Sequence, residues 1–216
     1  LGAELRACGV EVIEYASFTC PHCAAFHANV WPQLKTNYVD TGKVQFTYRE
    51  VYFDRYGLWA AMVARCGGEM RYFGIIDMIF EQQQEWAASD DPNVVIGNLR
   101  TIGKAAGLDD AALDVCLKDG AKAEAMVAHF EANMEADGVE GTPTFIINGK
   151  LRPGMLDDKS LAEIGRWPWA RTHSTMPSGL PARPQMLNWT SFTVSPSAGG
   201  RGPFERVSSG ATRPPA

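Results

Sequence analysis

Residues 10–23 read Val-Glu-Val-Ile-Glu-Tyr-Ala-Ser-Phe-Thr-Cys-Pro-His-Cys, and this stretch decides the fold class. Its first nine residues are largely apolar, β-branched or aromatic, which predicts a strand. Residues 24–38 continue with apolar side chains at helical spacing. Cys20 and Cys23 are therefore predicted at the first turn of a helix, directly after a strand.

A helix N-terminus lowers the pKa of a cysteine placed there. The first N–H groups lack intrahelical partners and the macrodipole adds partial positive charge, so the thiolate is stabilised. Such positions lower a cysteine pKa from ~8.5 into the range ~3.5–7.5, and the thiolate is the form that attacks disulfides. His22 can add positive charge or an N–H donor to a thiolate at Cys20. We interpret the Cys-Pro-His-Cys motif as a redox-active pair.

Two other interpretations of the motif stay open. Cys20 and Cys23 could form half of a zinc site with His27, although no second close Cys/His pair follows. They could also form a structural disulfide, which would not need the Pro-His insert. Redox chemistry is the favoured interpretation.

Length and composition predict an ordinary globular chain. The 216 residues are 45% apolar, enough for one domain or a small domain with an insertion. No run approaches the ~18 apolar residues of a membrane span. The chain begins Leu1-Gly2-Ala3-Glu4, without the basic and apolar regions of a signal peptide, so it is either cytosolic or a trimmed mature form.

Charge divides the chain into two parts. Residues 166–216 hold six arginines, no lysine and one acid, for a net charge of +5, which leaves −10 for residues 1–165. Nucleic-acid binding usually needs a basic face. The acidic body argues against nucleic acid as a partner.

The pattern along the chain predicts an interrupted α/β core. Residues 1–56 hold its first part, because a second strand at 44–53 completes a β-α-β unit with parallel strands. Residues 57–138 are predicted as a helical insertion. Its expected helices span 58–72, 75–86, 93–106, 111–117 and 122–136.

Sheet signals resume in residues 139–167, the predicted second part of the core. Asn148-Gly149 predicts a hairpin turn, and 157–167 predicts a last helix. Residues 168–216 hold eight of the thirteen prolines and lack periodicity. We expect no packed core there, and interpret the stretch as a disordered extension or a non-native terminus.

Three features in this order resemble the DsbA family of thiol:disulfide oxidoreductases: residues 14–23, the helical insertion, and Gly-Thr-Pro-Thr-Phe-Ile-Ile-Asn-Gly at 141–149. The resemblance implies an α/β, thioredoxin-like fold with an inserted all-helical domain. It makes Cys20 the exposed nucleophile, Cys23 the buried resolving thiol, and the Pro21-His22 insert the element that stabilises the thiolate. It also makes Pro143 a cis-proline facing the disulfide, with Thr142 on the substrate platform.

Glu14 resembles the acid that family members bury beneath the active-site sulfurs. There it would have a raised pKa and pass protons to or from Cys23. Its alternation with Val12 could instead point it toward solvent. The family's usual lysine partner is missing, because the matching position is Tyr48, followed by Arg49. The partner of Glu14 is left open.

Cys66 and Cys116 lie in the predicted insertion, 50 positions apart. Some members of the family carry a second disulfide there, whereas two independent buried thiols are the alternative. Cys8 is assigned no role.

The resemblance implies an enzyme that oxidises reduced, unfolded secreted proteins with its Cys20–Cys23 disulfide. It implies no cofactor or metal, a monomer, a periplasmic location after removal of a signal peptide, and reoxidation by a quinone-linked membrane partner. A disulfide isomerase or reductase of the same fold, and a non-catalytic module that binds metal or unfolded chains, are the alternatives.

Overall fold

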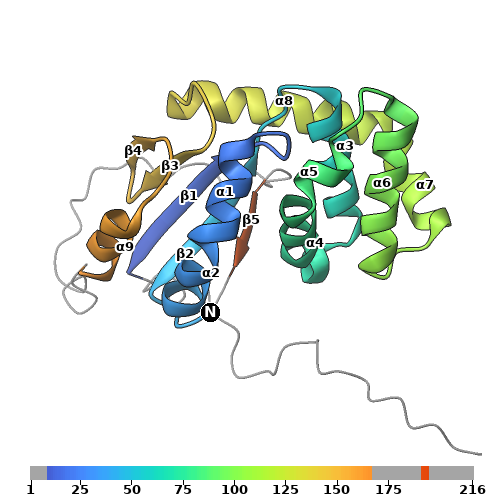
Figure 1. Ribbon diagram of the computed structural model, residues 1–216. Helices are drawn as coiled ribbons and strands as arrows, with labels where there is room; N and C mark the ends of the chain where they lie inside the picture. The colour runs from blue at the N-terminus through green and yellow to red at the C-terminus, as the bar shows by residue number, and fades with distance from the viewer. Residues whose placement is uncertain (1–8, 167–190, 195–216) are drawn as a thin grey trace, which may run out of the picture.

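The computed structural model describes residues 9–166 and 191–194 (Figure 1). Its centre is a five-stranded sheet in the order β4-β3-β1-β2-β5. β1 and β2 are parallel, and each other neighbouring pair is antiparallel. The strands are β1 (Val10–Ala16), β2 (Val44–Glu50), β3 (Thr144–Ile147), β4 (Lys150–Pro153) and β5 (Ser191–Val194).

The β-α-β unit predicted from the first 56 residues is present. Its crossover consists of α1 (Pro21–Asn29), α2 (Trp31–Leu34) and a π-helical turn over Lys35–Val39. The helix expected without a break over 24–38 is interrupted at Val30. Pro32 lies two residues later, and a proline inside a helix has no N–H for the carbonyl four residues earlier.

Six helices lie between β2 and β3 in the chain, as expected for an insertion. They are α3 (Arg55–Cys66), α4 (Glu69–Glu81), α5 (Gln83–Trp86), α6 (Pro92–Ala105), α7 (Asp110–Leu117) and α8 (Gly120–Asp137). The predicted helix over 58–72 was wrong, because Gly67 and Gly68 end α3 and Gly68 adopts a φ of +67°. The predicted helix over 75–86 also breaks, at Gln82.

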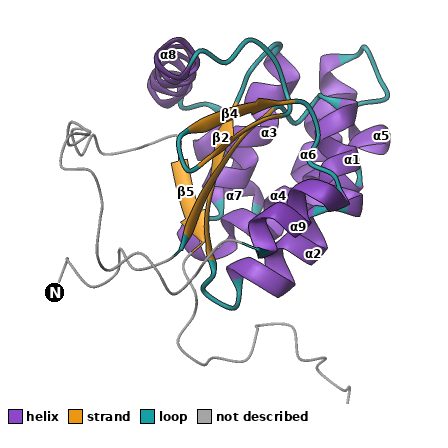
Figure 2. Ribbon diagram, turned by 90° about the vertical axis from the view of Figure 1, so that its left-hand side faces the viewer, coloured by secondary structure: helices purple, strands orange, loops and turns teal. Residues whose placement is uncertain are grey.

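Helices cover both faces of the sheet (Figure 2). Tyr15 points to the face under α8, where its hydroxyl donates to the Asp137 carboxylate. The neighbouring residue Glu14 points to the opposite face, which α1 and α4 of the insertion cover. The main apolar core lies on that second face and includes Phe18, Phe46 and Phe80. The redox motif therefore follows β1, a strand that is covered by helices on both faces.

The hairpin predicted at Asn148-Gly149 joins β3 to β4. Both turn residues have positive φ, 47° and 77°, as a tight hairpin turn requires. A last helix, α9 (Asp158–Gly165), follows and is capped by the side chain of Asp157.

One part of the fold differs from expectation. Residues 168–216 were expected to lie outside the packed core, yet residues 191–194 form β5 and pair antiparallel with β2. An edge strand presents free N–H and C=O groups, and the sequence Ser-Phe-Thr-Val has the β-branched and aromatic character that suits pairing. Residues 167–190 and 195–216 lie outside the described residues.

Candidate active site

Cys20 occupies the N-cap of α1. Its backbone is extended, with φ −85° and ψ 118°, and α1 begins at Pro21, whose fixed φ suits the first helical position. Cys20 is partly exposed, whereas Cys23, one turn later, is fully buried. Both are free thiols in the structure.

The surroundings of Cys20 favour its thiolate. They lower its pKa from an ordinary 9.0 to about 5, against the effect of desolvation. The largest cause is a hydrogen bond from the Cys23 thiol, and the backbone N–H groups of Cys23 and His22 add to it. The contribution of His22 to this lowering comes from its backbone N–H, and the residue itself is exposed.

Cys23 has the opposite character. Its pKa is raised well above the ordinary value by its hydrogen bond to Cys20, by burial, and by the charge of Glu14. At neutral pH the pair therefore holds one thiolate, at Cys20, and one thiol, at Cys23. This is the charge distribution of a nucleophile beside a protonated resolving partner.

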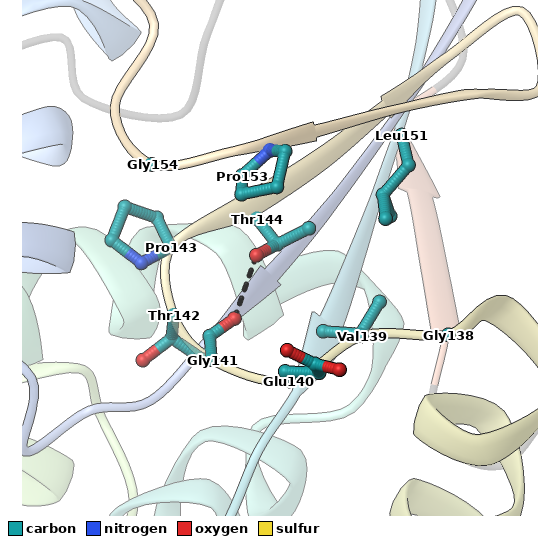
Figure 3. A pocket seen from close by; sticks show the side chains of 10 residues that line it. All are labelled: Gly138, Val139, Glu140, Gly141, Thr142, Pro143, Thr144, Leu151, Pro153 and Gly154. Carbon is teal, nitrogen blue, oxygen red and sulfur yellow. Dashed lines mark hydrogen bonds between the residues drawn. The ribbon is translucent and has the colours of Figure 1, made fainter.

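The loop before β3 lies against the exposed sulfur. The Thr142–Pro143 peptide bond is cis, and the Cys20 Sγ lies 3.5 Å from the Thr142 carbonyl oxygen. A pocket of about 390 Å³ opens beside this loop, lined by Glu140, Thr142 and Pro143 among others (Figure 3). The Thr144 hydroxyl holds the loop by donating to the Gly141 carbonyl at 2.7 Å. Thr142 thus both lines this pocket and places its carbonyl oxygen against the Cys20 sulfur.

Glu14 is fully buried, which excludes the solvent-facing alternative. Burial is the main reason that its pKa is raised, and the Cys20 charge adds to this. Its Oε2 lies 3.1 Å from His27 Nε2, and His27 lowers the pKa of the carboxyl in part. Tyr48 does stand opposite Glu14 in the strand register, where the family's lysine was expected. The partner of Glu14 is nevertheless His27, from α1.

The other candidate partner, Arg49, lies on the far face of the sheet. It pairs there with Asp137 of α8. Sequence reasoning weighed His27 only as a zinc ligand and missed this contact. The signal was present in the spacing, since a residue four after Cys23 shares its helix face and faces β1.

His27 is packed tightly under the insertion. Its ring stacks on Phe80 with centroids 4.0 Å apart, and it also contacts the rings of Phe26, Trp31 and Tyr48. Among the residues that the structure describes, no group of three or more His, Cys, Asp or Glu side chains is arranged to hold a metal ion. The zinc alternative used His27 as a metal ligand, whereas in the structure the Nε2 atom of His27 contacts the Glu14 carboxyl.

Asp54 also supports the active-site turn, and sequence reasoning missed it. Its carboxylate accepts from the Thr19 hydroxyl at 2.6 Å and from the backbone N–H groups of Tyr56 and Gly57. The residue that caps α3 thus also fixes the residue before Cys20. Its N-cap position was a detectable signal; its contact with Thr19 is set by the fold.

Cys66 and Cys116 form a disulfide between α3 and α7, with Cα atoms 5.8 Å apart. This is the pairing that the resemblance implies, away from the redox motif. Cys8 lies outside the described residues.

A family model described as thioredoxin matches residues 6–164. This chain belongs to the thioredoxin family. Within that family, its structural neighbours include alpha-DsbA1 of Wolbachia pipientis, with a TM-score of 0.67 and 28% identity over 74% of this chain and 85% of that one. A protein-disulfide isomerase of Novosphingobium aromaticivorans gives 0.63 and 26%, over 74% and 94%. These neighbours confirm the DsbA-like thioredoxin fold with a helical insertion.

Curated relatives of this thioredoxin-family chain also carry the name of disulfide oxidoreductases. A Rickettsia bellii protein, named as a candidate protein-disulfide oxidoreductase, is 35% identical over 141 residues. The match covers 65% of this chain and 53% of that protein. The chain thus spans about half the length of this relative. No helix among the described residues has the length and apolar character needed to cross a membrane.

Proposed function

We propose that this protein is a thiol:disulfide oxidoreductase that introduces disulfides into reduced, unfolded proteins through Cys20 and Cys23. The single observation that carries the proposal is the asymmetry of the pair. Cys20 is accessible with a pKa of about 5, whereas Cys23 is buried with a raised pKa. The disulfide of the pair is the only redox group that the reaction needs.

The reaction starts from the oxidised protein. A substrate thiolate attacks Cys20 Sγ, the Cys20–Cys23 bond breaks, and Cys23 leaves with the electron pair and takes up a proton. A second substrate thiolate then attacks the substrate sulfur of the mixed disulfide, and Cys20 leaves as a thiolate. The substrate gains one disulfide, and two electrons remain on the reduced pair.

Stabilisation of the Cys20 thiolate sets the direction of disulfide transfer, from this protein to its substrate. A stable thiolate is a good leaving group, and it favours the reduced form, so the disulfide is a strong oxidant; DsbA is the extreme example of this relationship. Glu14 is the proposed acid-base group beside Cys23. Its raised pKa and its contact with His27 suit a carboxyl that supplies the proton as Cys23 leaves.

The proposed substrate platform is the loop around Thr142 and Pro143. An extended substrate would hydrogen-bond the Thr142 backbone like an added strand, within reach of Cys20. Reduced exported proteins are the proposed substrates, and a quinone-linked membrane protein is the proposed oxidant of the reduced pair. The Cys66–Cys116 disulfide supports action in an oxidising compartment such as the periplasm.

An isomerase or reductase of the same fold is the alternative, favoured by the likeness to the Novosphingobium isomerase. The equilibrium of the pair with glutathione separates the two directions. A strong oxidant transfers its disulfide almost completely to glutathione at millimolar concentrations, whereas a reductase retains it.

The decisive experiment follows disulfide transfer to a reduced model protein with three forms of this chain. We expect wild type to oxidise the substrate and Cys20→Ser to be inactive. Cys23→Ser, mixed with an oxidised substrate, should accumulate a mixed disulfide at Cys20, since no resolving thiol is present. Trapping by Cys20→Ser in place of Cys23→Ser would overturn the assignment of the nucleophile.

A further inference from the structure

Gln83, from the helical insertion, makes a direct side-chain contact with the backbone of Cys20. Its side-chain Nε2 lies 2.7 Å from the Phe18 carbonyl oxygen and 3.0 Å from the Cys20 carbonyl oxygen. An amide NH₂ group carries two hydrogens, so it can donate to both acceptors at once. The Gln83 side chain is buried, at 6% exposure, where an unpaired amide would be costly.

The two carbonyls belong to the turn that presents the redox pair. The Cys20 carbonyl also accepts from the backbone N–H groups of Cys23 and Ala24, which start α1. The Phe18 carbonyl lies two residues earlier, in the turn that follows the end of β1 at Ala16. Gln83 therefore joins the turn that follows β1 to the start of α1.

Gln83 is held firmly in place. The chain breaks its helical course at Gln82, where φ is −99° and ψ is 16°, and α5 starts again at Gln83. Trp86 anchors α5 because its indole is 1% exposed and donates to the Ile79 carbonyl at 2.8 Å. Phe80 packs on the Phe18 ring with centroids 5.1 Å apart. Buried contacts of Phe80, before Gln83 in the chain, and of Trp86, after it, thus hold the amide in position.

We propose that Gln83 is a positioning residue of the redox site, whose amide fixes the backbone of Cys20 so that the first N–H groups of α1 face the Cys20 sulfur. The inference rests on the proposed function and adds to it a means by which the helical insertion sets the reactivity of the motif. Asp54 holds Thr19 on the other side of the same turn. The Asp54 carboxylate and the Gln83 amide, both from residues that follow β2, therefore hold the same turn by hydrogen bonds.

The matched experiment compares Gln83 with Gln84, its exposed neighbour on α5. Gln83→Met removes both donors at similar length, and Gln84→Met makes the same change without touching the turn. The reduced proteins are titrated by thiolate absorbance, and Cys20 is alkylated at a series of pH values. No substrate is present, so the result does not depend on the proposed activity.

We expect Gln83→Met to raise the Cys20 pKa by about one unit, which lowers the alkylation rate below the wild-type pKa roughly tenfold. The rates should converge at high pH, where all three proteins are thiolate. The equilibrium constant for disulfide transfer to glutathione should fall by a similar factor. Gln84→Met should match wild type in each measurement.

A purely structural role predicts a lower unfolding midpoint with an unchanged titration curve and glutathione equilibrium, and that result would overturn the proposal. Gln83→Glu keeps the size of the side chain and replaces the donor with an acceptor, so it answers the question if Gln83→Met does not fold. Its control is Gln84→Glu, which adds the same charge nearby. If wild type fails to oxidise thiols while Gln83 still shifts the titration, the proposed function fails and the positioning role stands.

Discussion

His27 Nε2 lies 3.1 Å from Glu14 Oε2 beneath the active-site sulfurs, and both side chains are at least 97% buried. The pair joins the first strand to the helix that carries Cys20 and Cys23. A buried carboxyl with one partner responds strongly to the loss of that partner, because the remaining group keeps its desolvation cost.

His27→Leu should lower the free energy of unfolding by about 1–3 kcal/mol at neutral pH, since it leaves the Glu14 carboxyl without this contact. Chemical denaturation measures the change. In a Glu14→Gln background the same substitution should be less costly. The matched control is His129→Leu, on the half-buried side of α8, which should change little. Equal costs in the two backgrounds would show that the residues are not coupled.

Glu14→Gln should stabilise the protein increasingly as pH rises. Burial raises the Glu14 pKa above its ordinary 4.5, so the folded state binds the proton more tightly than the unfolded state. That stabilisation is present below 4.5 and is lost as pH rises through the folded pKa. Unfolding both proteins in the oxidised form, from about pH 4 to about pH 8, should show a widening gap in favour of the variant. A constant gap would mean that the Glu14 pKa is not raised.

The reduced protein should gain stability from Cys20 between about pH 5 and pH 9. The folded pKa is about 5 and the ordinary value is 9.0, so the thiolate contribution is complete above 9.0 and absent below 5. The difference in free energy of unfolding between reduced wild type and reduced Cys20→Ser checks this window. Both proteins retain Glu14, whose own titration cancels to first order. A difference that falls as pH rises would contradict the sign.

Replacing both Cys66 and Cys116 by alanine should lower the free energy of unfolding by about 4 kcal/mol, given the separation of 50 residues. The urea midpoint of the oxidised double variant measures the loss. The titration of Cys20 should stay unchanged, because the bond joins α3 to α7 away from the motif. A shifted Cys20 curve would show that this disulfide also acts on the redox site.

The sequence by itself determined the elements that depend on neighbouring residues. Cys20 at the start of a helix follows from a strand, a proline at the first helical position and apolar spacing, all within residues 10–38. The Asn148-Gly149 turn follows from the tolerance of these two residues for positive φ. These features are local, so a single stretch of chain carries enough information to place them.

Tertiary structure alone decided the contacts that surround the sulfurs. Glu14 meets His27 because β1 packs against α1, and Gln83 reaches the Cys20 carbonyl only because the chain turns at Gln82. β5 pairs with β2 although more than 140 residues separate them in sequence. Such contacts depend on how layers pack and on which edge is left open, and no spacing along the chain records either.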